Sequence, residues 1–258
     1  MSEPPPIRTE RRGAALWIWI DREARRNAMN GQVLAGIEAA VRKLDADVRC
    51  VVLTGAGRRA FCAGADLSVG TGTFMRNLDE PTTDFGRLAR VMRGLGVPSI
   101  ARINGDCLAG GMGLAAMCDL AVAADHARFG LPEVKVGVFP MQVLVFLRSL
   151  IGARHINELC LTADFMDAPR AREIGLVNYV VPFDDLDARV ETLAARLAEM
   201  SPAALRRGKF AIAAMEQMAF PEAIAFAETL ISVTAMTADA TEGLAAFNEK
   251  RAPDWTKK

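Results

Sequence analysis

Short apolar runs that alternate with segments of helical period are the feature that most constrains the fold of this chain. Apolar residues recur on one helical face between Val33 and Leu44, and a second helix is predicted around residues 85–95. Strands that alternate with helices favour parallel β-α-β units, so the pattern predicts an α/β fold. The predicted strands are residues 14–20, 50–54, 99–103 and 119–123.

The chain changes character beyond residue 140, where helical segments dominate around one further strand at residues 177–181. The helices beyond Pro202 are expected to form a separate layer, so we divide the chain into residues 1–200 and 201–258. Residues 68–83 have no period and many turn formers, which predicts a long loop of the kind that is often functional. The predicted helices span residues 141–150, 154–162, 167–174, 184–199, 202–217, 221–236 and 239–250.

Composition excludes several classes of protein. The 258 residues contain 31 Lys and Arg against 31 Asp and Glu, so no basic excess predicts a nucleic-acid partner. The five cysteines form no C-x-x-C, and neither histidine lies in a cluster with metal-ligand spacing, so we expect reduced thiols and no metal. No apolar stretch approaches membrane-spanning length, and residues 1–12 lack the apolar core of a signal peptide, so we expect a cytoplasmic protein without a membrane partner.

Three segments carry candidate chemistry, and each follows a predicted strand. In FCAGADL (61–67) and in the Gly-rich segment at 104–114, small side chains leave backbone N–H groups uncovered beside a helix start. Two such loops after successive parallel strands can converge at one sheet edge, which makes a two-donor oxyanion hole plausible. Glu133 lies among apolar neighbours, where desolvation would raise its pKa toward that of a general base.

Each segment also has an ordinary structural interpretation. Asp66 alone predicts a capped turn, the glycines alone predict close helix–strand packing, and a single loop glutamate is usually solvated. Residues 111–116 fit G-x-G-x-x-A, yet the first glycine does not directly follow the strand, which disfavours a dinucleotide site. The chain has no G-x-S-x-G elbow and no P-loop.

Taken together, these segments resemble the crotonase superfamily, also called the enoyl-CoA hydratase/isomerase family. The resemblance covers essentially the whole chain in family order. It implies a core of repeated ββα units (the ClpP/crotonase spiral) and a C-terminal helical region, residues 201–258, that assembles a homotrimer or a dimer of trimers. The matching segments are residues 26–30 (RNAMN), 61–67, 103–123, 127–140, 171–181 and 242–255.

The resemblance also implies roles for individual residues. Ala65 and Gly110 would supply the N–H groups that hold a thioester oxygen, and Glu133 would be the acid/base. A coenzyme A thioester would be the substrate, with no separate cofactor, and the turn at residues 22–28 and the loop at 63–67 would line its site. Lys250 or Arg251 would reach it from a neighbouring subunit. The implied substrate-binding residues are Arg26, Ala28, Ala63, Asp66, Leu67, Gly113, Met141, Gln142 and Lys250.

The chain departs from the two-glutamate pattern of well-known hydratases in the family. Glu133 falls on the second glutamate, but the first falls on Gly113. Three hypotheses follow. The chain is an enoyl-CoA isomerase with a single carboxylate, or a one-glutamate hydratase like the methylglutaconyl-CoA hydratases, or a divergent member. A divergent member would be a C–C lyase or a non-catalytic protein that binds acyl-CoA. In the second, Gln142, Asp106 or a substrate carboxylate would help to hold the water.

Overall fold

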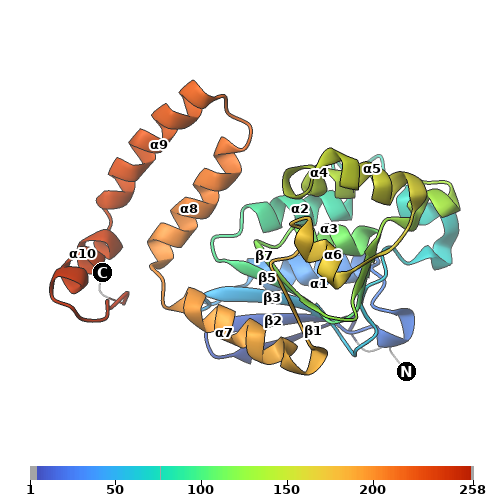
Figure 1. The fold of residues 1–258 in the computed structure, drawn as a ribbon, viewed down its shortest axis with the longest axis horizontal. Coiled ribbons are helices and arrows are strands. Elements are labelled where there is room, and N and C mark those ends of the chain that lie inside the picture. The colour runs from blue at the N-terminus through green and yellow to red at the C-terminus, as the bar shows by residue number, and fades with distance from the viewer. Residues whose placement is uncertain (1–4, 76, 257–258) are drawn as a thin grey trace.

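The computed structural model, which describes residues 5–75 and 77–256, contains two β-sheets that share one series of ββα units (Figure 1). Four consecutive units, β1-β2-α1, β3-β4-α2, β5-β6-α3 and β7-β8-α4, confirm the predicted repeat and the α/β class. The strands are β1 (Ile7–Arg12), β2 (Ala15–Ile20), β3 (Cys50–Gly55), β4 (Ala60–Cys62), β5 (Ser99–Ile103), β6 (Asp106–Leu108), β7 (Leu120–Ala124), β8 (Arg128–Gly130), β9 (Met166–Asp167) and β10 (Tyr179–Val181).

The larger sheet has the order β1-β2-β3-β5-β7-β10. Its strands are parallel except β1, which pairs antiparallel with β2. Side chains alternate between its faces, as a strand requires. In β3, Val51 and Leu53 pack beneath the helices that follow the strands, whereas Cys50 and Val52 pack with Trp17 toward α7 on the opposite face.

The smaller sheet has the order β4-β6-β8-β9, and its first three strands are parallel. Helices cover the two sheets, with α7 on one side of the larger sheet and α1 to α6 on the other (Figure 1). The helices are α1 (Gly31–Arg42), α2 (Asp84–Arg93), α3 (Gly110–Ala116), α4 (Met141–Leu150), α5 (Ala153–Thr162), α6 (Ala168–Glu173), α7 (Leu186–Ala198), α8 (Pro202–Met215), α9 (Phe220–Ala235) and α10 (Ala238–Asn248). Short 3-10 segments are η1 (Glu23–Arg25), η2 (Leu67–Phe74), η3 (Pro132–Val136) and η4 (Phe183–Asp185).

Helices α8, α9 and α10 form an arm that extends away from the layered core (Figure 1). Lys209 of α8 forms an ion pair with Asp119 at the start of β7, and Arg93 of α2 donates to the carbonyl of Ala213 at 2.8 Å. Large apolar side chains of the arm are exposed, which leaves an apolar surface uncovered in the single chain. They include Phe210, Ile212, Phe220, Ile224, Ile231, Met236, Leu244 and Phe247.

The structure adds two features that the sequence did not predict. Residues 7–12 form the edge strand β1, although their charged composition gave no strand signal. The loop predicted at 68–83 begins with 3-10 turns as far as Phe74. Among the described residues, no single helix is long and apolar enough to cross a membrane; one sharply bent pair, α9 with α10, meets that length and composition together.

Candidate functional site

Three loops leave the same edge of the smaller sheet. The strands β4, β6 and β8 are neighbours and parallel, with Cys62 opposite Cys107 and Leu108 opposite Gly130. Their carboxyl ends therefore lie side by side, and the chain continues from them into residues 63–67, 109–113 and 131–133. The fold thus brings together the three segments that the sequence singled out.

Backbone contacts join these loops closely. The N–H of Ala109 donates to the carbonyl of Gly130 at 2.9 Å, which ties the start of α3 to the segment before Glu133. Gly64 adopts a left-handed φ of 99°, and a Cβ atom there would lie 2.7 Å from the Cβ of Ala109 and 3.6 Å from the nitrogen of Gly110. Only glycine fits at residue 64, because both the backbone angle and the space exclude a side chain.

The N–H groups of Ala65 and Gly110 are uncommitted. The N–H of Met29 donates to the carbonyl of Gly64 at 2.8 Å, and the carbonyl of Met29 accepts from the N–H of Asp66 at 2.8 Å. These two bonds form a β-bridge that engages the residues on either side of Ala65 but not its own N–H. Gly110 is the first residue of α3, where helix N–H groups have no internal acceptor. Within residues 5–75 and 77–256, neither N–H donates a hydrogen bond.

Glu133 lies in the short helix η3, directly after Pro132. Its Oε2 atom is buried and has no hydrogen-bond partner among the described residues. Burial raises the pKa of Glu133, since desolvation disfavours the charged form. Burial also raises the pKa of the Cys160 thiol to about 11, and the nearby Glu133 charge adds to that shift. A carboxyl group with one buried oxygen free of partners and a raised pKa is suited to moving protons.

The turn before α1 is fixed against the first loop. Asn27 is fully buried and donates to the carbonyls of Ala56 at 2.9 Å and Ala60 at 2.7 Å. Arg22 forms an ion pair with Asp66 at 2.8 Å, and this hydrogen-bonded guanidinium is the main reason that the pKa of Asp66 falls to about 2. Asp66 also accepts from the N–H of Ser68, as the predicted helix cap requires.

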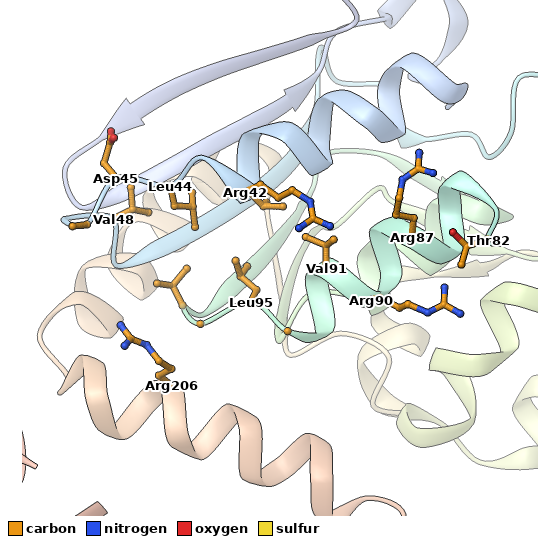
Figure 2. A pocket seen from close by; sticks show the side chains of 15 residues that line it. Arg42, Leu44, Asp45, Val48, Thr82, Arg87, Arg90, Val91, Leu95 and Arg206 are labelled. Atoms are coloured by element: carbon orange, nitrogen blue, oxygen red, sulfur yellow. The ribbon is translucent and has the colours of Figure 1, made fainter. Parts of the chain in front are cut away.

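A groove of about 770 Å³ lies elsewhere, between α1, α2 and the start of α8. Its lining contains none of the predicted site residues. Figure 2 shows that its four arginines point in different directions, so their guanidinium groups do not converge on one ligand atom. Within the part of the chain that the structure describes, no group of three or more His, Cys, Asp or Glu side chains is arranged to hold a metal ion.

Comparison with known proteins decides the family. Residues 10–258 match the family model described as enoyl-CoA hydratase/isomerase. The chain belongs to the enoyl-CoA hydratase/isomerase family. It is 38% identical over 247 residues to a probable enoyl-CoA hydratase of Mycobacterium tuberculosis, covering 93% of each chain. It is 34% identical to the crotonyl-CoA hydratase of Syntrophomonas wolfei, covering 93% of this chain and 94% of that protein.

Solved structures agree with this family assignment. The enoyl-CoA hydratase of Bacillus anthracis is 31% identical and superimposes with a TM-score of 0.90, covering 98% of this chain and 100% of that chain. The enoyl-CoA hydratase structure from M. tuberculosis is 33% identical with a TM-score of 0.89, covering 99% of this chain and 100% of that one. TM-scores this high over nearly the whole chain show that it has the fold of these enoyl-CoA hydratases, the crotonase fold.

In this enoyl-CoA hydratase/isomerase family member, the space beside Gly113 is filled. A Cβ atom at residue 113 would lie 2.7 Å from Cζ of Phe85 and 3.2 Å from Cγ2 of Val143. The two groups considered as water holders are also engaged. Asp106 accepts from Arg128 at 2.9 and 2.7 Å, and Gln142 donates to Oγ1 of Thr83 at 2.7 Å.

The remaining predicted binding residues are spread over the molecule. Arg26 is exposed at the turn, and its carbonyl accepts from Ala63 at 3.1 Å, while Ala28 accepts from Arg22. Leu67 and Met141 are 48% and 67% exposed. Lys250 follows α10, which lies on the arm that extends away from the layered core (Figure 1). Sequence reasoning included Arg22 and Asn27 only as part of the turn at residues 22–28 and gave no site role to Phe85. The ion pair of Arg22 and the buried hydrogen bonds of Asn27 become visible only in the structure.

Proposed function

We propose that this chain acts on an enoyl-CoA thioester, with Glu133 as the only acid/base and the N–H groups of Ala65 and Gly110 as donors to the thioester oxygen. One observation carries the proposal. The loops that leave one edge of the smaller sheet hold both the buried Oε2 atom of Glu133, which has no partner among the described residues, and the two uncommitted N–H groups. A thioester α-proton is weakly acidic, and its removal places negative charge on the carbonyl oxygen. Preorganised donors stabilise that charge, and losing one typically costs about 10²–10³ in rate.

For a 3-enoyl-CoA, the proposed reaction is a double-bond isomerisation. The Glu133 carboxylate takes a proton from C2, and the electron pair of that C–H bond delocalises onto the carbonyl oxygen. The protonated Glu133 then returns the proton to C4, and the double bond moves to C2–C3. No atom is gained or lost, so one carboxyl group is enough. The apolar filling beside Gly113 favours this reaction over one that needs a held water.

Hydration is the second candidate, and the names of the relatives favour it, since they include a crotonyl-CoA hydratase. In that reaction the hydroxyl of water bonds to C3, and a proton reaches C2 through Glu133. Glu133 alone would then have to orient and activate the water. A homologue that only binds acyl-CoA, or that cleaves a C–C bond, would keep the same loops and would not catalyse either reaction.

The site for the coenzyme A moiety is proposed at the joined turn and loop. The turn and the loop are joined by the backbone bond from Ala63 to Arg26, and the carbonyl of Ala28 accepts from Arg22. The ion pair between Arg22 and Asp66 also connects the turn to the loop. We assign Asp66 a structural role beside the ligand, because its carboxylate is already engaged. Lys250 would contribute from a second copy of the chain.

Assembly into a trimer, or a dimer of trimers, is proposed for the arm. Its exposed apolar residues, Phe220 and Phe247 among them, are 79% and 80% exposed in the single chain, and burial against another copy would remove them from water. Light scattering after size exclusion tests this assembly. A monomer at micromolar concentration would contradict it.

Mass spectrometry of the products tests the function. The purified protein is incubated with 2-enoyl-CoA and 3-enoyl-CoA substrates of several lengths, and with 3-methylglutaconyl-CoA. An unchanged mass with a moved double bond establishes isomerisation, and a product heavier by one water establishes hydration. Glu133→Gln should abolish either activity, and turnover that survives this substitution refutes the proposed role of Glu133.

A further inference from the structure

Residue 113 faces the proposed reaction from the helix α3. Gly110 and Gly113 are three residues apart, so they lie on the same side of that helix, one above the other. A side chain at residue 113 would therefore project beside the thioester held at Gly110. The occupant of this space is not a side chain of α3 but the ring of Phe85 from α2, with Val143 from α4 beside it.

We propose that Phe85 is a specificity-determining residue that keeps this side of the acyl site dry, so that the enzyme transfers protons within an aliphatic 3-enoyl-CoA rather than adding water. This inference rests on the proposed function. Phe85 is 9% exposed and Val143 is 4% exposed, so together they present a hydrocarbon wall. A buried water needs two to four polar partners, and a hydrocarbon wall offers none.

The wall is held in position by a polar contact between its two helices. Thr83 caps α2 by accepting from the N–H of Gly86 at 3.0 Å. Its Oγ1 also accepts from the side-chain amide of Gln142 in α4 at 2.7 Å. This contact ties the start of α2 to the start of α4. Thr83 is two residues before Phe85, and Gln142 is one residue before Val143. It also engages the side-chain amide of Gln142, one of the groups considered above for binding the reacting water.

The test introduces a carboxylate at residue 113 with and without the ring. Gly113→Glu alone should be destabilised and should not gain hydration, because the new side chain meets Phe85. Phe85→Ala alone should leave hydration low, since an apolar cavity stays dry. The double variant Phe85→Ala/Gly113→Glu has both space and a polar partner for water. Its ratio of hydrated to isomerised product should rise about tenfold or more over the unmodified protein.

A matched control distinguishes the effect of removing the Phe85 ring from the effect of removing any apolar side chain from the core. Leu88 lies one turn further along α2 and is fully buried, so Leu88→Ala removes similar apolar volume from the same helix without opening the space beside Gly113. Leu88→Ala/Gly113→Glu should therefore keep the low hydration ratio. The proposal is overturned if this control, or Gly113→Glu alone, hydrates as well as the Phe85 double variant. It is also overturned if the unmodified protein adds water as fast as it moves the double bond.

A stability cycle tests the wall without any substrate. Gly113→Ala should lower Tm by about 2–8 °C, because the added methyl meets the ring. In a Phe85→Leu background the loss should be clearly smaller, and equal losses in both backgrounds would overturn the proposed contact. If the unmodified protein turns over no enoyl-CoA, the proposed function fails, and this cycle alone then decides whether Phe85 fills the space.

Discussion

Replacing Asn27 should weaken both the stability of the chain and the site that Ala65 belongs to. Asn27 makes three hydrogen bonds: two buried ones from its Nδ2, to the carbonyls of Ala56 and Ala60 at 2.9 and 2.7 Å, and one part-buried bond accepted from the N–H of Arg22 at 3.1 Å. At about 1 kcal/mol each, their loss costs about 3 kcal/mol. The backbone at Asn27 has a left-handed φ of 55°, which adds about 1 kcal/mol for alanine.

Asn27→Ala is therefore expected to lower the free energy of unfolding by about 4 kcal/mol. Asn27→Gly tolerates the left-handed angle and should lose about 1 kcal/mol less, which separates the side-chain bonds from the backbone effect. Urea denaturation at one fixed protein concentration measures both variants, since assembly would make stability depend on concentration. A loss below about 1 kcal/mol in Asn27→Ala would refute the reasoning, because removing three hydrogen bonds, two of them buried, should cost more than that.

The same substitution should reduce turnover beyond its effect on folding. The segment that Asn27 anchors continues into Met29, which bonds to both sides of Ala65. Loosening this segment would move the Ala65 N–H away from the thioester oxygen. We expect a lower kcat for Asn27→Ala at temperatures where the variant remains folded. An unchanged kcat in the folded variant would show that the turn does not position Ala65.

Three further predictions follow from charge and exposure. Burial raises the pKa of Glu133, so folding takes up a proton between its ordinary pKa of 4.5 and the raised value, and stability falls as pH rises through that window. Glu133→Gln should therefore be more stable than the unmodified protein at pH 7, and the gain should vanish below pH 4 in denaturant titrations. Asp66 has a pKa lowered from 3.8 to about 2, so its contribution is present above 3.8 and lost as pH falls through 2. Asp66→Ala should cost about 1–2 kcal/mol at pH 7 and less at pH 2 by the same titrations. On the arm, Phe220→Glu should shift light scattering toward the monomer, whereas Met75→Glu, an exposed change outside the arm, should not.

The main strands and helices could be predicted because their sequences are long enough to show a period. Both β3 (Cys50–Gly55) and β5 (Ser99–Ile103) are buried on both faces. Residues 50–53 show this burial as a continuous apolar run, whereas residues 99–103 also bury Ser99 and Arg102. The strands β4, β6 and β8 have three residues each, too few for any period, so the smaller sheet could not be predicted from local pattern. The edge strand β1 was missed because one face is solvated and carries charge.

The candidate site was only partly predictable. The small residues near Ala65 and Gly110 and the isolated Glu133 gave a chemical signal in the sequence. The absence of a side chain at Gly113 was also visible, but its meaning was not, because Phe85 and Val143 reach that space from helices 28 and 30 residues away in the sequence. Packing of this kind depends on tertiary structure and leaves no mark in a local motif.

Hydrogen exchange at C2 of a saturated acyl-CoA tests the central claim most directly, because it requires only enolate formation and neither hydration nor isomerisation. Butyryl-CoA is incubated with the protein in D₂O, and the deuterium content at C2 is followed by NMR. The account predicts exchange by the unmodified protein and a decrease of about 10²–10⁴-fold in Glu133→Gln. Exchange at an undiminished rate in Glu133→Gln, or no exchange by an unmodified protein that binds butyryl-CoA, would contradict it.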